Sequence, residues 1–232
     1  MRLYELAYAC RLYAALGDFD SSFLEFRKTV KPALDLSNHA HRKALLVWLN
    51  SWGCRQFAID YHSMASKALV RWGRLNLNRL PHKMGALAEL SDLILDVAAE
   101  AYGDLKDRNA SLRSRKTGLY PVTFGPTGAA KVLFALRPNT LPPWDDPIRK
   151  YFGYDGSAHS YRDFLNKVRE EVCKLQDEAA NFGISANDIP ACIGRPDSSL
   201  PKLIDEYYWV TITNGYTPLG LEDLERWTRW AR

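Results

Sequence analysis

Two features that could do chemistry stand close together between Gly125 and Lys150. The first is a Gly-Pro-Thr-Gly turn at 125–128, which opens an apolar segment and presents backbone N–H groups at a helix start, where a phosphate can bind. The second is the pair Asp145 and Asp146, placed where another helix begins and where the helix dipole favours an ionised carboxylate. A phosphate grip with a fixed anion nearby suits chemistry at a sugar that becomes cationic.

The elements that must position these groups are almost all helical. Apolar residues recur at helical spacing from Leu3 to Trp230, while alternating runs typical of strands are nearly absent. The pattern predicts an all-α protein of about ten helices, built as a single unit over 1–232 from two packed lobes. The polar, basic stretch Lys106–Lys116 is expected to be a loop.

Composition limits the class of protein. The chain has 232 residues, 47% hydrophobic and 25% charged, with a net charge of +4, which is an ordinary globular balance and compatible with a nucleic-acid partner. The four cysteines lie far apart in the sequence, so we expect free thiols, no metal and no cofactor. No apolar run is long enough to cross a membrane and the start reads as an amphipathic helix, so we expect a cytoplasmic monomer without a membrane partner.

The segment from Gly125 to Asp145 resembles the helix–hairpin–helix DNA glycosylase superfamily. Phe-Gly-Pro-Thr-Gly-Ala-Ala-Lys at 124–131 is similar to the hairpin, and Trp144-Asp145-Asp146-Pro147-Ile148-Arg149 is similar to the segment that carries the family's catalytic aspartate. The resemblance covers roughly 40–152 and implies a helix–hairpin–helix near 118–136 that binds DNA. Without it, the Gly-x-x-Gly turn would be read as a simple loop and helix cap.

The chain departs from the family pattern at the lysine that makes many members strand-cutting lyases. The family places that lysine two residues after the second hairpin glycine, where this chain has Ala130, and Lys131 follows one residue late. One residue rotates a helical side chain by about 100°. We therefore expect Lys131 to miss the pocket and to contact a phosphate or lie in solvent.

The resemblance assigns catalysis to Asp145, with Asp146 as the alternative register. Pro147 suits the first helical position, which would make Asp146 the N-cap and leave Asp145 without a structural task unless it faces a pocket. The residues expected to bind DNA are Gly125, Thr127, Gly128, Lys131, Arg113, Arg115 and Lys116. Those expected at the base pocket or wedge are Asn50, Ser51, Trp52, Trp144 and Arg149; the tryptophans could equally belong to the core.

The resemblance implies a monofunctional DNA glycosylase, acting on double-stranded DNA that carries a modified or damaged base. Such an enzyme hydrolyses the N-glycosidic bond of a flipped-out base and leaves an abasic site. The expected substrate is a hypermodified cytosine of phage DNA, such as glucosylated hydroxymethylcytosine, which implies antiviral defence. The alternatives are a repair glycosylase for alkylated bases and a non-catalytic helix–hairpin–helix module that binds DNA.

Overall fold

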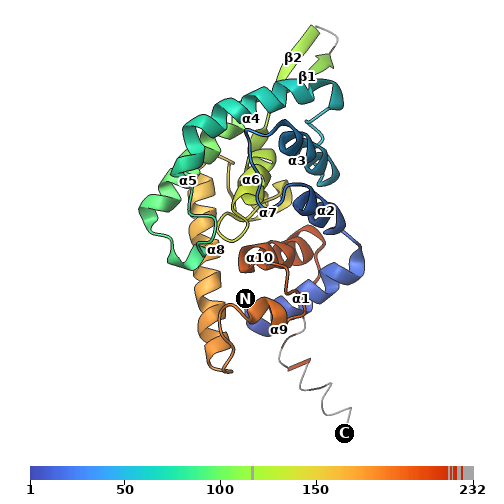
Figure 1. Cartoon of the computed structure of the whole chain (residues 1–232). Coiled ribbons are helices and arrows are strands. Elements are labelled where there is room, and N and C mark those ends of the chain that lie inside the picture. Colours follow the sequence, from blue (N-terminus) through green and yellow to red (C-terminus); the bar gives the residue numbers. More distant parts are fainter. Residues whose placement is uncertain (116–117, 219, 221, 224–225, 227–232) are drawn as a thin grey trace.

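The computed structural model describes residues 1–115, 118–218, 220, 222–223 and 226 (Figure 1). This part of the chain is mostly helical, with ten α-helices and one two-stranded sheet, so the prediction of a helical fold is confirmed. The α-helices are α1 (Leu3–Leu16), α2 (Ser21–Thr29), α3 (His39–Ser51), α4 (His62–Asn76), α5 (Asp92–Lys106), α6 (Gly125–Leu136), α7 (Asp146–Tyr151), α8 (Ala158–Ala180), α9 (Ile189–Cys192) and α10 (Leu200–Tyr208). Shorter turns of 3-10 helix lie at Ile59–Tyr61, Leu77–Arg79 and Leu87–Glu89, and a π-helical turn at Trp209–Thr213 follows α10.

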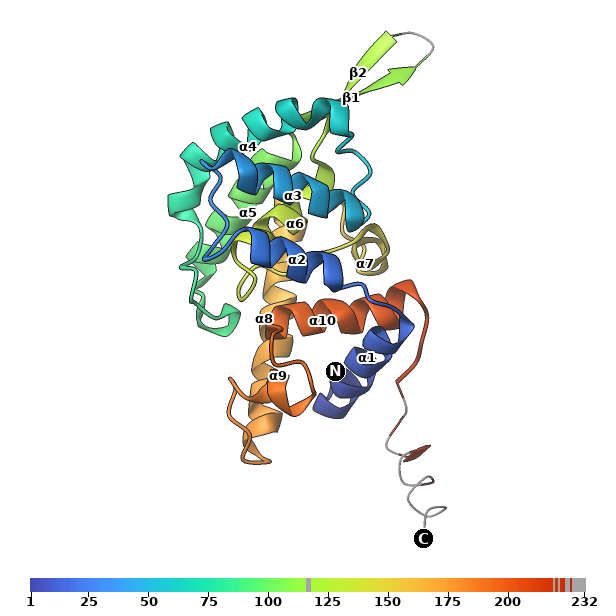
Figure 2. The same cartoon turned by 45° about the vertical axis from the view of Figure 1, so that its right-hand side comes forward.

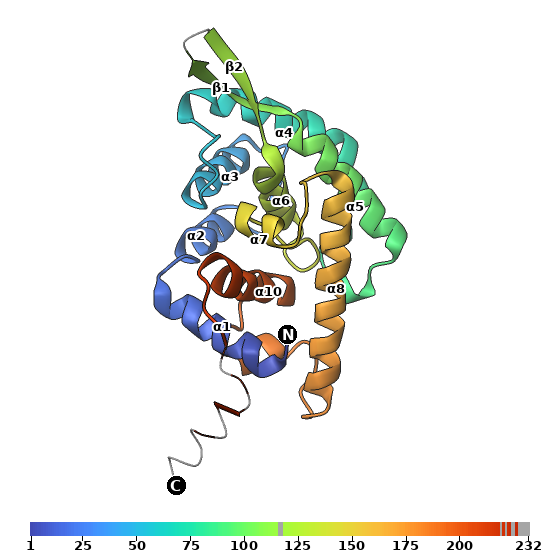
Figure 3. The ribbon, with the colours of Figure 1, turned by 180° about the vertical axis from the view of Figure 1, so that it is seen from behind.

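Helix α6 is the central element of the fold. It runs through the middle of the bundle and packs against α3 and α5 (Figures 1 and 3). Every residue from Gly128 to Leu136 is buried, as expected for a helix that is apolar on all sides. One hydrophobic core surrounds it and extends from Leu6 in α1 to Tyr208 at the end of α10.

The two ends of the helical part of the chain pack together. Helices α1 and α10 are in contact, and both lie below α2 and α7 in Figure 2. The start of α1 is also fixed to the long helix α8, because the Leu3 amide donates to the Glu178 carboxylate at 2.9 Å. The contact brings α1 and α10 to one side of the central helix.

The sheet is a β-hairpin that projects from the bundle beyond the start of α4 (Figures 1 and 2). Strand β1 (Asn109–Arg115) pairs antiparallel with β2 (Gly118–Thr123). Its base is anchored: the Ser111 hydroxyl donates to the Gln56 carbonyl at 2.6 Å, and Ala110 is buried. The expectation of a loop at Lys106–Lys116 is therefore wrong for Asn109–Arg115, while Lys116 lies outside the described residues.

The segment expected to hold the helix–hairpin–helix has a different structure. Residues 118–123 form strand β2, and α6 follows almost at once, so the helix expected ahead of the turn is replaced by a strand. Gly125 takes a left-handed conformation with φ of 66°, and Pro126 occupies the first turn of α6, where its missing N–H costs nothing. The turn that leads into α6 is thus present, but it joins a strand to a helix.

Candidate active site

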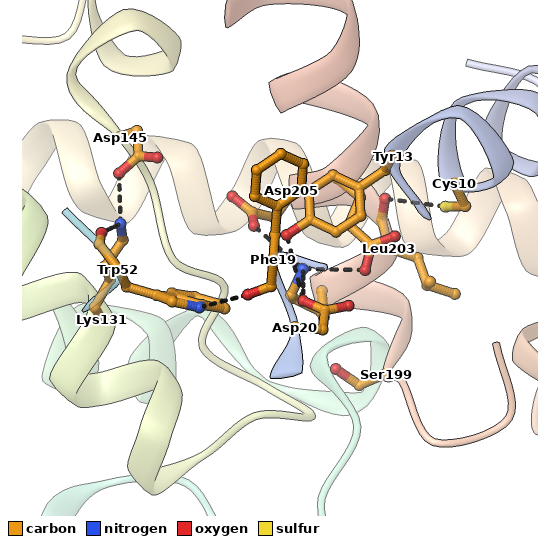
Figure 4. A network of polar contacts seen from close by, with 12 residues as sticks. Cys10, Tyr13, Phe19, Asp20, Trp52, Lys131, Asp145, Ser199, Leu203 and Asp205 are labelled. Atoms are coloured by element: carbon orange, nitrogen blue, oxygen red, sulfur yellow. Dashed lines mark hydrogen bonds and ion pairs between the residues drawn. The ribbon is translucent and has the colours of Figure 1, made fainter. Parts of the chain in front are cut away.

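Lys131 is the one charged residue inside α6, and it is buried with 5% of its surface exposed. A buried ammonium group must be paired. Its Nζ lies 2.9 Å from the Asp145 Oδ1 and donates to the Trp52 carbonyl at 2.7 Å (Figure 4). Lys131 was expected to miss the pocket and to contact a phosphate or lie in solvent. It lines the cavity and is buried instead, because its long side chain turns toward Asp145 from the buried helix.

Asp145 precedes α7 and faces the pocket, whereas Asp146 faces outward. The Asp145 backbone is extended and its side chain makes no capping hydrogen bond. Asp146 begins α7 and pairs with Arg149 and with Lys150 at the helix surface. The expected N-cap role of Asp146 is not seen: its carboxylate is taken up by these ion pairs, which leaves Asp145 as the carboxylate beside Lys131.

The Lys131–Asp145 pair lines a cavity of about 400 Å³, which is within the usual size of a small-molecule site. Its walls come from both ends of the described chain and from the central helices. They are the end of α1, the α1–α2 connection, the start of α2, the end of α3, α6, the residue before α7, α10 and the π-helical turn after it. The lining residues are Tyr13, Asp18, Phe19, Ser21, Ser22, Ser51, Trp52, Lys131, Asp145, Asp205 and Trp209. Four aromatic side chains and several hydroxyl and carboxyl groups therefore surround the pair.

Trp52 connects the pair to the rest of the cavity. The Lys131 Nζ lies 5.3 Å from the centre of the Trp52 ring, close enough for a cation–π contact. The indole N–H donates to the Phe19 carbonyl at 3.2 Å (Figure 4), and the ring stacks on Phe134 at 5.8 Å between centroids. Trp52 is thus both a core residue on one side and a wall of the cavity on the other.

Electrostatics keep the amine of Lys131 protonated in the resting protein. Burial lowers the pKa of Lys131, but the Asp145 carboxylate raises it, and the net pKa is above the ordinary value. The nearby Cys54 is no competing nucleophile, because burial raises the pKa of its thiol to about 11. To act as a nucleophile, Lys131 must pass a proton to a base, and Asp145 is in contact with it.

A second set of charges lies behind the cavity. Lys202 is buried and pairs with Glu206 at 3.0 Å and with Asp20 at 3.4 Å. Arg195 pairs with the same two carboxylates. These residues stand beside Tyr13, over whose ring the Lys202 Nζ lies at 4.6 Å. Each cation of this network is paired with carboxylates of α10 and of the α1–α2 connection. The network therefore joins these two parts of the cavity wall.

The cavity contains only part of the expected base pocket. Ser51 and Trp52 line it. Asn50 instead donates to the Phe57 carbonyl at 2.5 Å, and Arg149 pairs with Asp146 on the outside of α7. Trp144 is fully buried among Tyr102, Tyr161 and Phe164, so its expected place at the base pocket is wrong and its alternative reading as a core residue is confirmed.

The residues expected to bind phosphate are also divided. Gly125 and Thr127 lie partly exposed at the start of α6. Gly128 is buried, and a Cβ there would lie 2.7 Å from the Gln56 amide nitrogen and 3.2 Å from the Phe57 ring. The absence of a side chain at Gly128 is therefore explained by packing inside the protein rather than by the approach of a phosphate.

The expected basic contacts lie on the β-hairpin. Arg113 is exposed on β1 and stands opposite Tyr120 of β2. Arg115 ends the same strand, and Lys116 lies outside the described residues. Arg113 is thus held on an exposed strand rather than on the loop that the sequence predicted.

Sequence reasoning missed the wall that comes from the two ends of the chain: Tyr13, Asp18, Phe19, Asp205 and Trp209. A signal was present for Asp205, because it stands in the strongly apolar run Leu203–Val210 with Glu206 as its acidic neighbour. Acidic residues within such a run are buried unless the helix has a polar face. Burial of a carboxylate costs free energy unless it is paired, so such a residue is a candidate for a site.

The arrangement places an amine, an ionised carboxylate and a second carboxyl group around one cavity. Such a set can provide a nucleophile, stabilise a cation and exchange protons. Within the described ranges, no cluster of three His, Cys, Asp or Glu side chains could hold a metal ion, and no helix is long and apolar enough to cross a membrane. Comparison of the chain with protein-family models, curated proteins and solved structures finds no match.

Proposed function

We propose that this protein is a DNA glycosylase, which breaks the bond between a modified or damaged base and its deoxyribose. The observation that carries the proposal is the Lys131–Asp145 pair, 2.9 Å apart in a cavity of about 400 Å³ with an aromatic wall. A base must leave the stack to be reached by such a pocket. Trp52, Phe19 and Trp209 offer rings against which it can lie.

Asp145 supplies the anion that the reaction needs. Breaking an N-glycosidic bond gives the sugar an oxocarbenium character, with positive charge on its ring. A carboxylate fixed beside the sugar stabilises that charge without reorganising. The Asp145 carboxylate lies 2.9 Å from the Lys131 ammonium and makes no capping hydrogen bond to α7, and it lines the cavity.

The position of Lys131 changes the expected mechanism. The monofunctional reading depended on a lysine that misses the pocket, and Lys131 lies inside it. In the proposed reaction the N-glycosidic bond breaks beside the Asp145 carboxylate, and its bonding pair leaves with the base. Lys131 then passes a proton to Asp145 as its amine forms a bond to C1′ of the sugar. The sugar ring then opens: the C1′–O4′ bond breaks, a proton of the bonded nitrogen moves to O4′, and a protonated Schiff base between Lys131 and C1′ remains. Loss of a C2′ proton to solvent expels the 3′ phosphate, which would make the enzyme a glycosylase with lyase activity.

Duplex DNA is the proposed partner, held by the β-hairpin and the start of α6. Arg113 supplies positive charge on β1, and the first N–H groups of α6, at Gly125 and Thr127, can donate hydrogen bonds to a phosphate. The two lobes expected from the sequence would meet at the cavity, with α1 and α10 on one side and α3, α6 and α7 on the other. We retain the proposal of a monomer that acts in the cytoplasm.

Hypermodified cytosine of phage DNA remains the proposed substrate, with a role in antiviral defence. An alkylated base handled in repair is the alternative. The walls of the cavity combine rings with Ser21, Ser22, Ser51 and Asp18, and hydroxyl and carboxyl groups of this kind can bind a sugar substituent through hydrogen bonds. This polar part of the wall favours a substrate with a hydroxylated substituent.

The test is release of a base from duplexes that each carry one glucosylated hydroxymethylcytosine, 8-oxoguanine or 7-methylguanine. Abasic sites appear as alkali-labile breaks, and lyase activity as breaks without alkali. With borohydride present, the wild type should form a covalent protein–DNA adduct that Lys131→Ala abolishes and Lys150→Ala retains, because Lys150 is exposed on α7. Abasic sites without any adduct would restore the monofunctional mechanism, and no release from any duplex would reject the glycosylase.

A further inference from the structure

Asp205 is a second carboxyl group in the cavity that the mechanism above leaves unused. Helix α10 brings it to the same cavity as Lys131 and Asp145, and 14% of its side chain is exposed. Among the residues that the structure describes, its carboxylate accepts no hydrogen bond, and the Lys202 ammonium lies 3.9 Å away. Lys202 already pairs with Glu206 and Asp20 at shorter distances, so Asp205 is free to face a ligand.

The surroundings of Asp205 favour its protonated form. Burial raises the pKa of Asp205 to about 7, against a weaker opposing effect of Lys202. The charged and titratable groups around it come from four elements: Lys202 and Glu206 of α10, Asp145 before α7, Lys131 of α6 and Tyr13 of α1. Asp145 differs, because an ammonium group lies 2.9 Å from it. One carboxyl group thus contacts an ammonium group, whereas burial raises the pKa of the other.

Two carboxyl groups with such different surroundings are a usual sign of divided acid and base roles. We infer that Asp205 is the general acid that protonates the departing base, and that the substrate is therefore a neutral modified base. The inference rests on the proposed glycosylase function and adds to it a catalytic residue and a substrate class.

The proton balance of the step is simple. The N-glycosidic bond breaks, and its electron pair remains on the base. The Asp205 O–H proton moves to a ring nitrogen or oxygen of the base, which leaves neutral, while Asp205 becomes a carboxylate. The nucleophile, Lys131 or water, forms the bond to C1′ and gives its proton to Asp145. Solvent exchange afterwards returns one proton to Asp205 and removes one from Asp145.

The need for this acid depends on the charge of the base. A neutral base, such as a hydroxymethylcytosine derivative, would leave as an anion if it were not protonated. An alkylated base such as 7-methylguanine is already cationic, and it leaves neutral without a proton. A general acid in the pocket is consequently useful only for the first class, and a protonated Asp205 next to Lys131 gives a cationic base no added help.

The test is single-turnover base release by the full chain between pH 5.5 and 9. The substrates are the duplexes with glucosylated hydroxymethylcytosine, 8-oxoguanine and 7-methylguanine, and the proteins are wild type, Asp205→Asn and Asp205→Glu. Asp177→Asn, at an exposed position of α8, is the control. Wild type should release a neutral base, with a rate that falls about tenfold per pH unit above neutrality. At pH 6 the rate of base release by Asp205→Asn should be lower than that of wild type by on the order of 100-fold, and the decrease in rate above neutrality should disappear. Asp205→Glu should recover part of the rate and part of its pH dependence.

Three results would overturn the inference. Release of 7-methylguanine alone would reject the neutral substrate and keep the glycosylase. An Asp205→Asn rate equal to wild type on a neutral base, with the same pH profile, would show that Asp205 is only part of the wall. No release from any duplex by the wild type would reject the proposed function together with this inference. The wild-type pH profile is informative even if Asp205→Asn fails to fold, because a rate that stays constant up to pH 9 contradicts a general acid of this kind.

Discussion

The Lys131 ammonium and the Asp145 carboxylate lie 2.9 Å apart at the junction of two helices. Lys131 comes from the interior of the buried helix α6, and Asp145 from the residue that precedes α7. The same ammonium donates to the Trp52 carbonyl at the end of α3. Three elements therefore fix this pair at the wall of the cavity, and the predictions below test the catalytic role that we propose for it.

Arg113 is predicted to contribute to DNA binding through the phosphates. Arg113→Ala should weaken binding about equally for all sequences and reduce the slope of log affinity against log salt by about one. Fluorescence anisotropy with a labelled duplex at several salt concentrations measures this slope. Lys174→Ala, on an exposed position of α8, should leave the slope unchanged. Equal slopes for Arg113→Ala and wild type would show that the hairpin does not contact DNA there.

Gly128 is predicted to matter for stability. In Gly128→Val the new side chain must displace the Gln56 amide, which donates to the Phe124 carbonyl at 2.7 Å. Overpacking of this kind costs about 1–3 kcal/mol, and urea unfolding measures it. DNA affinity of the folded variant should stay near that of wild type. Unchanged stability with weakened DNA binding would return Gly128 to the phosphate-binding role that the sequence suggested.

Asp205 is predicted to make the protein less stable as the pH rises. Its ordinary pKa is 3.8, and burial raises it to about 7 in the folded chain. Between these values the folded state binds more protons than the unfolded state, so this group lowers the free energy of unfolding by about 1.4 kcal/mol for each unit of rising pH. Asp205→Asn cannot ionise and removes that loss. Urea unfolding at pH 5 and pH 8 should therefore show the variant gaining stability relative to wild type at the higher pH. If the difference in free energy of unfolding between variant and wild type were the same at pH 5 and pH 8, this account of Asp205 would be contradicted.

The helices were predictable where burial follows helical spacing over several turns. In α1, Leu6, Cys10 and Tyr13 are buried at that spacing. The β-hairpin was not, because β1 alternates small and basic residues and β2 contains Pro121, which usually argues against a strand. In a sheet of only two strands every strand has a free edge, so Pro121 is tolerated.

The sequence could predict that a side chain reaches the cavity only where this depends on the residue's position along its own helix. Asp145 precedes α7, and its place beside a pocket follows from that position. Lys131 was misplaced because its register was taken from the family pattern, whereas its direction depends on how α6 packs on all sides. Asp205 and Tyr13 reach the cavity through the contact between α1 and α10, a long-range contact that local patterns do not contain.

The most direct test of the central claim is single-turnover base release by Asp145→Asn, compared with wild type and Asp146→Asn. Asparagine keeps the size of Asp145 and can still accept a hydrogen bond from Lys131, so the fold should survive. We predict a loss on the order of 100-fold or more, because the anion that stabilises the sugar cation is gone. Asp146→Asn loses its ion pairs with Arg149 and Lys150, none of which lines the cavity, and its rate should remain close to that of wild type. Wild-type rates in Asp145→Asn, on a duplex that the wild type cleaves, would contradict the claim that this pair is the active site.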